Sequence, residues 1–274
     1  MNDKFIAVAM SVYHADKPDY FYLALNSLFN QTYSNVDVYI QVDGPISKAL
    51  KKVICDFQHQ NKRIFVDFYP ESKGLAFQLN RAISTILNKK KYHFIARMDS
   101  DDISDINRFQ KQVDFFNERK NIAVLGSSII EFDSNGKKYT KIMPTEHKTL
   151  TNNIIKRCPF NHPTVMFNLS VINNKDLLYK SELKNTQDYY LWVDLLSKGY
   201  IFSNISQPLL YFRVDDDFHK RRGINKAIND LKSRFYAMKI LKCYSVNNFF
   251  FAISLFILRF SPTFVRKLAY KNLR

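Results

Sequence analysis

The stretch His-Phe-Ile-Ala-Arg-Met-Asp-Ser-Asp-Asp, residues 93–102, places three carboxylates directly after a short apolar run. Residues 93–98 have the length and composition of a buried strand. Asp99, Asp101 and Asp102 would repel one another and lose hydration at the end of such a strand, and a divalent cation removes both costs. Oxygen ligands select a hard ion such as Mg²⁺ or Mn²⁺. We therefore expect a strand that ends in a metal site.

Strand-like and helix-like segments alternate around this stretch. Repeated βα units predict an α/β fold with a mostly parallel central sheet and helices on both faces. Ligands in such sheets bind beyond the carboxyl ends of the strands, where Asp43 and Asp99 are both expected. The expected strands are residues 5–11, 36–42, 64–68, 93–98, 123–132, 164–167 and 208–214, and the expected helices are residues 20–29, 47–60, 75–87, 106–119 and 189–198.

The acidic cluster has alternative interpretations when it is taken alone. Asp102 or Asp105 could cap the helix expected from Ile106. A cap explains one carboxylate but not three. The same cluster could also serve a nuclease or a phosphatase, so it indicates a metal site without choosing a reaction.

Other candidate residues are ambiguous from their spacing. Asp43-Gly44-Pro45 is more readily an ordinary turn than a site where Asp43 accepts a hydrogen bond from a base or ribose. Asp188, at an expected helix start, could be a first-turn residue favoured by the helix dipole or a general base. His162 stands alone in an expected loop, where histidines are more often structural. Asp215-Asp216-Asp217 is more simply a solvated turn than a second metal cluster.

No glycine-rich phosphate loop occurs in the chain. Neither G-x-x-x-x-G-K-[ST] nor G-x-G-x-x-G is present, and there are only 6 Gly. A diphosphate would therefore have to be held by a metal and by side chains, for which Lys73, Arg81 and Arg97 are candidates.

Positive charge concentrates at the C-terminus. From residue 219 onward, thirteen Lys and Arg stand against Asp230 alone, which accounts for +12 of the net charge of +16. Residues 249–258 are almost wholly apolar, but ten residues are too few to span a bilayer, which needs about 20. Basic amphipathic helices favour a helix lying in the membrane interface; the alternative is that these helices simply pack on the domain. We expect a domain at residues 1–218 and a membrane-associating tail at residues 219–274.

Three scattered cysteines (Cys55, Cys158 and Cys243) and the N-terminal residues give expectations about the compartment. The odd number and wide spacing of the cysteines argue against a disulfide framework or a zinc site and fit a reducing compartment. The first residues lack the pattern of a signal peptide.

The combined pattern resembles family 2 glycosyltransferases over roughly residues 5–215. Any one of the motifs is weak evidence, but seven in the expected order are strong. The segments are Val8-Ala9-Met10-Ser11-Val12-Tyr13-His14, Ser27-Leu28-Phe29-Asn30-Gln31-Thr32-Tyr33, Val42-Asp43-Gly44-Pro45, Lys73-Gly74-Leu75, Arg97-Met98-Asp99-Ser100-Asp101-Asp102, Asn161-His162-Pro163-Thr164-Val165-Met166-Phe167 and Asp188-Tyr189-Tyr190-Leu191-Trp192.

This resemblance implies a GT-A (Rossmann-like) fold and inverting sugar transfer of the bacterial surface-polysaccharide type. It makes Asp188 the catalytic base and Asp101, with Asp99, the ligands of Mn²⁺ or Mg²⁺ in a DXD-type motif. Nucleotide-sugar contacts are implied for Asp43, Lys73, Arg97, Asp99 and Tyr13, and a site-shaping or acceptor role for His162 and Trp192. Gln187 stands where the family often has Glu, and Val42 where the nucleotide turn often carries a first acid.

The resemblance also implies a donor, an acceptor and a place in the cell. The donor would be a nucleotide sugar, with UDP-hexose favoured. The acceptor would be a lipid-diphosphate-linked saccharide of O-antigen or capsule synthesis, reached by a peripheral protein on the cytoplasmic face of the inner membrane. The rivals are a metal-dependent nuclease that uses the basic tail on phosphates and a non-catalytic sugar-binding protein. The long apolar runs in the tail argue against nucleic acid.

Overall fold

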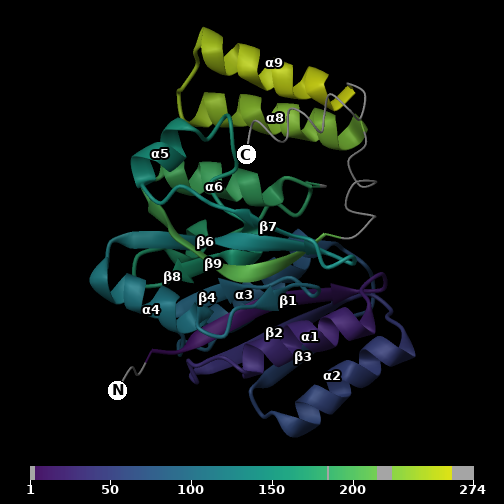
Figure 1. The fold of residues 1–274 in the computed structure, drawn as a ribbon. Helices are drawn as coiled ribbons and strands as arrows, with labels where there is room; N and C mark the ends of the chain where they lie inside the picture. Colours follow the sequence, from purple (N-terminus) through teal and green to yellow (C-terminus); the bar gives the residue numbers. More distant parts are fainter. Residues whose placement is uncertain (1–3, 184, 215–223, 261–274) are drawn as a thin grey trace.

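The protein is a mixed sheet covered by helices on both faces, with a helical pair on one side (Figure 1). The structure is a computed structural model that describes residues 4–183, 185–214 and 224–260. The strands pair in the order β3-β2-β1-β4-β8-β6-β9-β5, and β7 pairs with β6. Their bounds are β1 (Ile6–Tyr13), β2 (Val36–Asp43), β3 (Ile64–Tyr69), β4 (Phe94–Arg97), β5 (Ile103–Ser104), β6 (Ile122–Asp133), β7 (Lys138–Lys141), β8 (Met166–Asn168) and β9 (Ile201–Val214).

The first half of the sheet follows the expected βα pattern. β1 pairs in parallel with β2 and with β4, and β2 pairs in parallel with β3. The crossovers are α1 (Pro18–Phe29), α2 (Lys48–Gln60) and α3 (Leu75–Asn88). The α/β fold class with helices on both faces is therefore confirmed, and the carboxyl ends of β1, β2 and β4 share one edge of the sheet.

The second half of the sheet is mixed, whereas the sequence predicted a mostly parallel sheet. β8 runs antiparallel to β4 and to β6, and β5 runs antiparallel to β9, while β6 and β9 are parallel. One antiparallel pair has a local cause: β6 turns back directly into β7 through a tight turn in which Gly136 has a φ of +76°. The other antiparallel pairs join short strands to partners far along the chain, β8 to β4 and β6 and β5 to β9.

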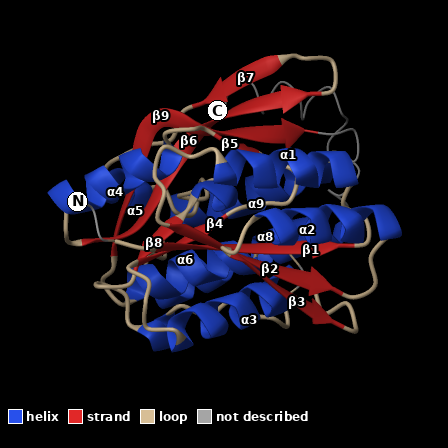
Figure 2. Cartoon of the chain, turned by 90° about the horizontal axis from the view of Figure 1, so that it is seen from below, coloured by secondary structure: helices blue, strands red, loops and turns tan. Residues whose placement is uncertain are grey.

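Two hydrophobic cores lie on opposite faces of the sheet, and β1 supplies both by alternation. Ile6, Val8 and Met10 pack with α1, α2 and α4 (Arg108–Glu118). Ala7 and Ala9 face α3 and α6 (Gln187–Ser197). Figure 2 shows α1 and α2 on one side of β1, β2 and β3 and α3 on the other. The small alanines let α3 and α6 approach closely.

Most element boundaries agree with the sequence expectations within two residues. Pro18 lies at the start of α1, and the Ser47 hydroxyl accepts the N–H of Leu50 as the cap of α2. The strand expected at residues 164–167 is wrong in part: a 3-10 turn at His162–Thr164 precedes β8. Pro163 explains this, because proline at the first helical position favours a turn. The remaining short helices are α5 (His147–Asn152) and the 3-10 turn Asn174–Asp176.

The C-terminal helices form a pair that packs against α6. α8 (Ile224–Ile240) and α9 (Val246–Phe260) lie side by side in Figure 1, with α8 between α9 and α6. A third core joins Tyr189 and Val193 of α6 to Ala237 and Met238 of α8 and Ala252 of α9. Within the described residues, no helix has the length and apolar character needed to cross a bilayer. The expected domain boundary at residue 218 and the basic residues from 261 onward lie outside the described residues.

Candidate active site

The three carboxylates of the acidic cluster meet at the carboxyl end of β4. One oxygen from each of Asp99, Asp101 and Asp102 lies within 4.8 Å of the others. Asp102 is fully buried, while Asp99 and Asp101 are partly exposed. Residues 98–102 form a short connection between β4 and the two-residue strand β5, and this connection brings the three carboxylates close together.

Asp102 does not cap a helix, contrary to that alternative. Its Oδ1 accepts the backbone N–H of Arg213 at 2.9 Å, and its Oδ2 has no hydrogen-bond partner. β5 follows Asp102 directly, so α4 begins farther on, at Arg108, and its first turn is preceded by Asp105, whose Oδ1 accepts the N–H of Asn107 at 3.0 Å. All three carboxylates of the cluster are thus available to one ligand.

Burial and mutual repulsion raise the pKa values in the cluster. Burial, then Asp99, then Asp16 raise the pKa of Asp101 to about 7. Burial is also the first cause that raises the pKa of Asp102, followed by Asp99 and Asp101. A hard divalent cation would relieve this repulsion, and three carboxylate oxygens within reach of one another are a donor set that such an ion prefers. The residues therefore fit a Mg²⁺ or Mn²⁺ ion.

Arg213 is a residue of this site that the sequence reading missed. It lies near the end of β9, where its Nε donates to the carbonyl oxygen of Asp101 at 2.9 Å in addition to its backbone bond to Asp102. Its guanidinium lies 3.8 Å from the ring centroid of Tyr20, and its Nη2 is buried without a partner. An arginine at a strand end gives no sequence signal that it reaches a turn 112 residues away.

Arg97 is a buried residue that forms an ion pair with Asp99 of the acidic cluster. It ends β4 with its side chain on the α3 and α6 face. Its Nη1 makes the ion pair with Asp99, whereas its Nε–H is buried without a hydrogen-bond partner. The positive charge of Arg97 also acts on the pKa values of Asp188 and His162. A buried guanidinium with an unsatisfied N–H group is costly, and an anionic ligand would satisfy it.

Asp188 lies in the first turn of α6 and is half-buried. Burial is the main cause that raises its pKa, and the charges of Arg97 and Lys226 oppose that effect. The neighbouring Gln187 keeps a buried Oε1 without a partner. A half-buried carboxylate with a raised pKa and nearby cations suits proton transfer, so the structure is compatible with the general-base alternative.

Asp43 ends β2 and holds the loop that leads into α3. Its carboxylate accepts the N–H groups of Lys73 at 2.7 Å and Gly74 at 3.0 Å, and the Nε2 of Gln78 at 2.7 Å. Gly44, with a φ of +79°, brings the turn against Ser72, where a Cβ would come within 2.4 Å of the Ser72 Oγ. Asp43 thus anchors the bend at Gly44 to the loop before α3, and the residue is 5% exposed.

The remaining side chains predicted for the site have different surroundings. His162 Nε2 lies 2.9 Å from the Tyr179 hydroxyl, and burial, then Arg97, lower its pKa well below the usual value. Trp192 is fully buried against Phe160, Phe167 and Phe202, so it is a core residue behind the site. Tyr13 is 37% exposed at the end of β1. Lys73 forms an ion pair with Glu71, and Arg81 forms one with Asp67.

The sheet brings the carboxyl ends of β1, β2 and β4 to one edge. The charge of Arg97 acts on Asp99 of the cluster and on the pKa of Asp188. Tyr13 is paired in register with Asp43. Arg81 lies at the same edge: its Nη1 donates to the Oε1 of Gln78, which in turn bonds Asp43, and its guanidinium stacks on Tyr69, the register partner of Asp43. Asp215, Asp216 and Asp217 lie outside the described residues.

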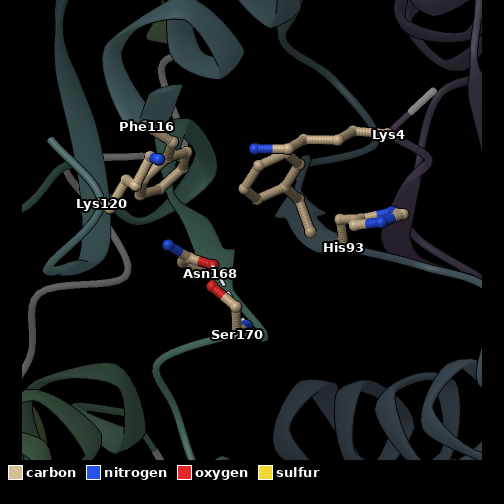
Figure 3. Close-up of a pocket in the computed structure, with 7 residues that line it drawn as sticks. Lys4, His93, Phe116, Lys120, Asn168 and Ser170 are labelled. Atoms are coloured by element: carbon tan, nitrogen blue, oxygen red, sulfur yellow. Dashed lines mark hydrogen bonds between the residues drawn. The ribbon is translucent and has the colours of Figure 1, made fainter. Parts of the chain in front are cut away.

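A separate pocket lies at the opposite end of β4 (Figure 3). It has a volume of about 140 Å³ and is lined by Lys4, His93, Phe94, Phe116, Lys120, Asn168 and Ser170. His93 directly precedes β4, whereas Asp99 follows it. The pocket is therefore at the amino end of the strand and does not belong to the acidic site.

Comparison with protein families gives a match to one model. The model described as Glycosyl transferase family 2 matches residues 7–177. This range includes the acidic cluster, Asp43 and Arg97, but ends before Asp188 and the C-terminal helices.

Curated proteins similar to this chain are named as glycosyltransferases. The Escherichia coli UDP-Gal:alpha-D-GlcNAc-diphosphoundecaprenol beta-1,3-galactosyltransferase is 30% identical, over 97% of this chain and 95% of its own length. The amylovoran biosynthesis glycosyltransferase AmsE of Erwinia amylovora is 29% identical, over 85% of each chain.

Solved structures share the fold at low identity. S. aureus TarS 1-349 in complex with UDP-GlcNAc matches with a TM-score of 0.67 and 19% identity, over 93% of this chain and 72% of that one. The mannosyltransferase PcManGT of Pyrobaculum calidifontis, in complex with GDP-Man and Mn²⁺, matches with a TM-score of 0.60 and 11% identity, over 97% and 79% of the two chains. These similarities concern the GT-A fold alone.

Proposed function

The chain belongs to glycosyl transferase family 2 and is a glycosyltransferase, and from this premise we propose that it transfers a hexose from a nucleotide sugar, with inversion, to a hydroxyl of a lipid-diphosphate-linked saccharide. The observation that carries the proposal is the buried Arg97, which pairs with Asp99 of the acidic cluster and whose charge also acts on Asp188. A cation site and a carboxylate base near one guanidinium suit a diphosphate leaving group and an acceptor hydroxyl.

In this proposal, Asp101 and Asp99 hold Mn²⁺ or Mg²⁺, which when bound supplies Lewis-acid stabilisation of the leaving diphosphate. Asp102, whose buried Oδ2 has no partner, is a further candidate ligand. The unsatisfied Nε–H of Arg97 would bind a phosphate oxygen of the donor. The nuclease alternative loses its support, because the family to which the chain belongs transfers sugars.

Asp188 accepts the proton of the acceptor hydroxyl in the proposed reaction. The hydroxyl oxygen then attacks the anomeric carbon from the face opposite the nucleotide, the bond from that carbon to the diphosphate oxygen breaks, and the configuration inverts. His162 is kept neutral by burial and Arg97, so it would shape the site through its contact with Tyr179 and would not add charge. Asp43, Lys73 and Tyr13 would line the nucleotide end.

A UDP-hexose donor is supported by names among similar proteins. One relative is named for UDP-Gal and one structural neighbour holds UDP-GlcNAc. The same relative is named for a diphosphoundecaprenol-linked acceptor, which supports a lipid-linked acceptor here. The basic C-terminal residues 219–274 would form a tail that keeps the enzyme at the cytoplasmic face of the inner membrane, in O-antigen or capsule synthesis. We do not propose nucleic acid as a partner of this protein.

The test is a transfer assay with a panel of nucleotide sugars, a lipid-diphosphate-linked saccharide and Mn²⁺ or Mg²⁺. Wild-type enzyme should transfer one hexose in a metal-dependent reaction. Asp101→Ala should lower transfer by at least about a hundredfold with an unchanged circular dichroism spectrum. The matched control is Asp56→Ala, an exposed helical aspartate that should keep full activity. An Asp101→Ala variant with wild-type activity would reject the metal assignment.

A further inference from the structure

The outer face of α9 exposes large apolar side chains. Val246, Phe249, Phe250, Ile257 and Phe260 form this outer face, and each is at least 49% exposed. Single exposed apolar residues are common on proteins and need no explanation. Five on one helix of 15 residues are different, because most helices bury such residues against the core.

The exposed residues lie together along one side of the helix. Positions 246, 250 and 257 are separated by four and seven residues, a spacing that places side chains above one another on an α-helix. Phe249 and Phe260 flank the same stripe. The opposite side carries Ala252, which is 1% exposed and belongs to the core shared with α8 and α6. α9 therefore uses one face for packing and presents an equally apolar face to the outside.

The helical pair that carries this face is rich in exposed cations. Lys232 and Lys239 of α8 are exposed, and their spacing of seven residues places them on one side of that helix. Lys242 is exposed in the turn that joins α8 to α9. Asp230 is the one carboxylate in the sequence of α8 and α9. An apolar stripe beside a set of cations is the pattern of a helix that lies in the interface of an anionic bilayer.

We propose that the outer face of α9 is a docking surface for an anionic phospholipid bilayer, a proposal that rests on the proposed lipid-linked acceptor. The aromatic and aliphatic side chains enter the interface, and Lys232, Lys239 and Lys242 contact the headgroups. A second copy of the chain is a poorer occupant, because the pairing of two such faces would bring two sets of cations together.

The proposal also gives the docked enzyme a defined orientation. α8 lies between α9 and α6, and the contacts of α8 with α6 include the ring pair Tyr190 and Tyr236 at 4.5 Å and the hydrogen bond that the Tyr236 hydroxyl donates to the Asp194 carboxylate. α6 begins at Gln187 and carries Asp188 in its first turn. A bilayer bound to α9 would therefore be held at a fixed position relative to Asp188, which suits an acceptor anchored in the same bilayer.

The test measures partition of the full chain onto vesicles of phosphatidylglycerol and phosphatidylcholine by sedimentation. The double variant Phe250→Ser/Ile257→Ser should bind at least about tenfold more weakly than wild type, because both side chains are exposed and their loss removes apolar area from the contact. The double variant Lys232→Glu/Lys239→Glu should also bind more weakly. Wild type should bind pure phosphatidylcholine vesicles poorly.

The matched control is Phe65→Ser/Phe68→Ser on β3, where two aromatic side chains are similarly exposed at the edge of the sheet. This control should keep wild-type vesicle binding. Equal binding by wild type and Phe250→Ser/Ile257→Ser would overturn the proposal. So would a wild-type dimer that the same substitutions convert to monomer while vesicle binding stays unchanged, because the face would then be a self-association surface.

Failure of this proposal can be separated from failure of the proposed function. Phe250→Ser/Ile257→Ser should retain transfer to an acceptor with a short, water-soluble lipid chain and lose transfer to an acceptor embedded in vesicles. If the variant loses vesicle binding but wild type transfers no sugar to any acceptor, the proposed function is rejected and the docking surface is supported. If wild type transfers the sugar but does not bind vesicles, the docking surface is rejected and the proposed function is supported.

Discussion

At the scale of single residues, the charge of the buried Arg97 acts on two acidic groups. Arg97 is ion-paired with Asp99 and lowers the pKa of Asp188, while burial raises it. The net result is a carboxyl whose pKa stays above the usual value. Ionisation of Asp188 therefore costs free energy in the folded protein, and this cost is what makes the carboxylate a better proton acceptor.

Asp188→Asn should bind the nucleotide sugar as wild type does and lose turnover by about a hundredfold or more, because the amide cannot accept the proton. In wild type, kcat should fall as the pH is lowered through the raised pKa of Asp188. Transfer rates from pH 4 to 8 measure both effects. Asp114→Asn, an exposed residue of α4, is the control. Wild-type kcat in Asp188→Asn would reject the base.

The same substitution should affect stability with a defined sign. A raised pKa in the folded state means that wild type loses stability as the pH rises from the unfolded-state pKa through the folded-state pKa. The gain in Tm of Asp188→Asn over wild type should therefore be greater at pH 7 than at pH 4. A gain that is greater at pH 4 would mean that Asp188 is stabilised as a carboxylate in the fold.

Arg213 acts as a positioning residue, because it contacts the acidic turn through the Asp101 carbonyl and the Asp102 carboxylate. Arg213→Ala should weaken Mn²⁺ binding by about tenfold to a hundredfold, the usual effect of removing a group that orients a ligand. Excess Mn²⁺ should restore activity. Titration calorimetry with Mn²⁺ and activity at several metal concentrations check this.

The control for Arg213 is Arg119→Ala, since Arg119 also stacks on an aromatic ring, Phe115, but lies away from the acidic turn. Its Mn²⁺ affinity should equal that of wild type. If Arg213→Ala unfolds, Arg213→Lys provides the test, because a lysine keeps the charge and the backbone bond but loses the Nε contact. Unchanged Mn²⁺ affinity in both Arg213 variants would contradict the positioning role.

Sequence reasoning at the scale of elements succeeded where the pattern is local. β1, β2 and the helices from α1 to α3 were predicted nearly to the residue, because apolar periodicity, Pro18 and Ser47 lie within each segment. β5 and β8 have two and three residues and were predicted poorly or not at all. Such short strands exist only through partners far along the chain, such as Tyr211 for Ile103.

The contact of α8 with α6 shows the same limit. Amphipathic helices were expected after residue 218, but nothing in the local pattern says that Tyr236 reaches Asp194 and Lys180. Both partners lie more than 40 residues earlier. Sequence reasoning therefore left open whether the tail packs on the domain, and the structure shows that α8 does pack on it.

Tyr236→Phe should lower the free energy of unfolding by about 1 kcal/mol, because one hydroxyl that joins α8 to Asp194 of α6 is lost. Urea unfolding followed by circular dichroism measures this. Tyr244→Phe, at an exposed position between α8 and α9, should change the stability by less than about 0.5 kcal/mol. Equal stability of Tyr236→Phe and wild type would mean that α8 is held by its apolar contacts alone.

The whole molecule combines three hydrophobic cores, one sheet edge that carries the candidate site and a basic C-terminal region. The sequence supported the α/β fold and the position of Asp99 and Asp101 at a strand end, because both depend on patterns along the chain. The roles of Arg97 and Arg213 depend on contacts between β4, α6 and β9, which no periodicity encodes. Trp192, a site-shaping candidate by its motif, packs against Phe160 and Phe202 in the core and lies beside His162, a packing that no local pattern predicts.

Ligands should stabilise the whole fold, because a metal and a nucleotide bind the assembled edge of the sheet and not the unfolded chain. At about a hundredfold over Kd, the gain is about 2.7 kcal/mol, which corresponds to a rise in Tm of roughly 5–10 °C for a domain of this size. We expect this rise with UDP and Mn²⁺ together, and its loss in EDTA, by differential scanning calorimetry. Asp101→Ala should show no rise, while Asp56→Ala should match wild type. A rise of equal size in Asp101→Ala would mean that the nucleotide binds without the acidic cluster, and the metal site would then have to lie elsewhere.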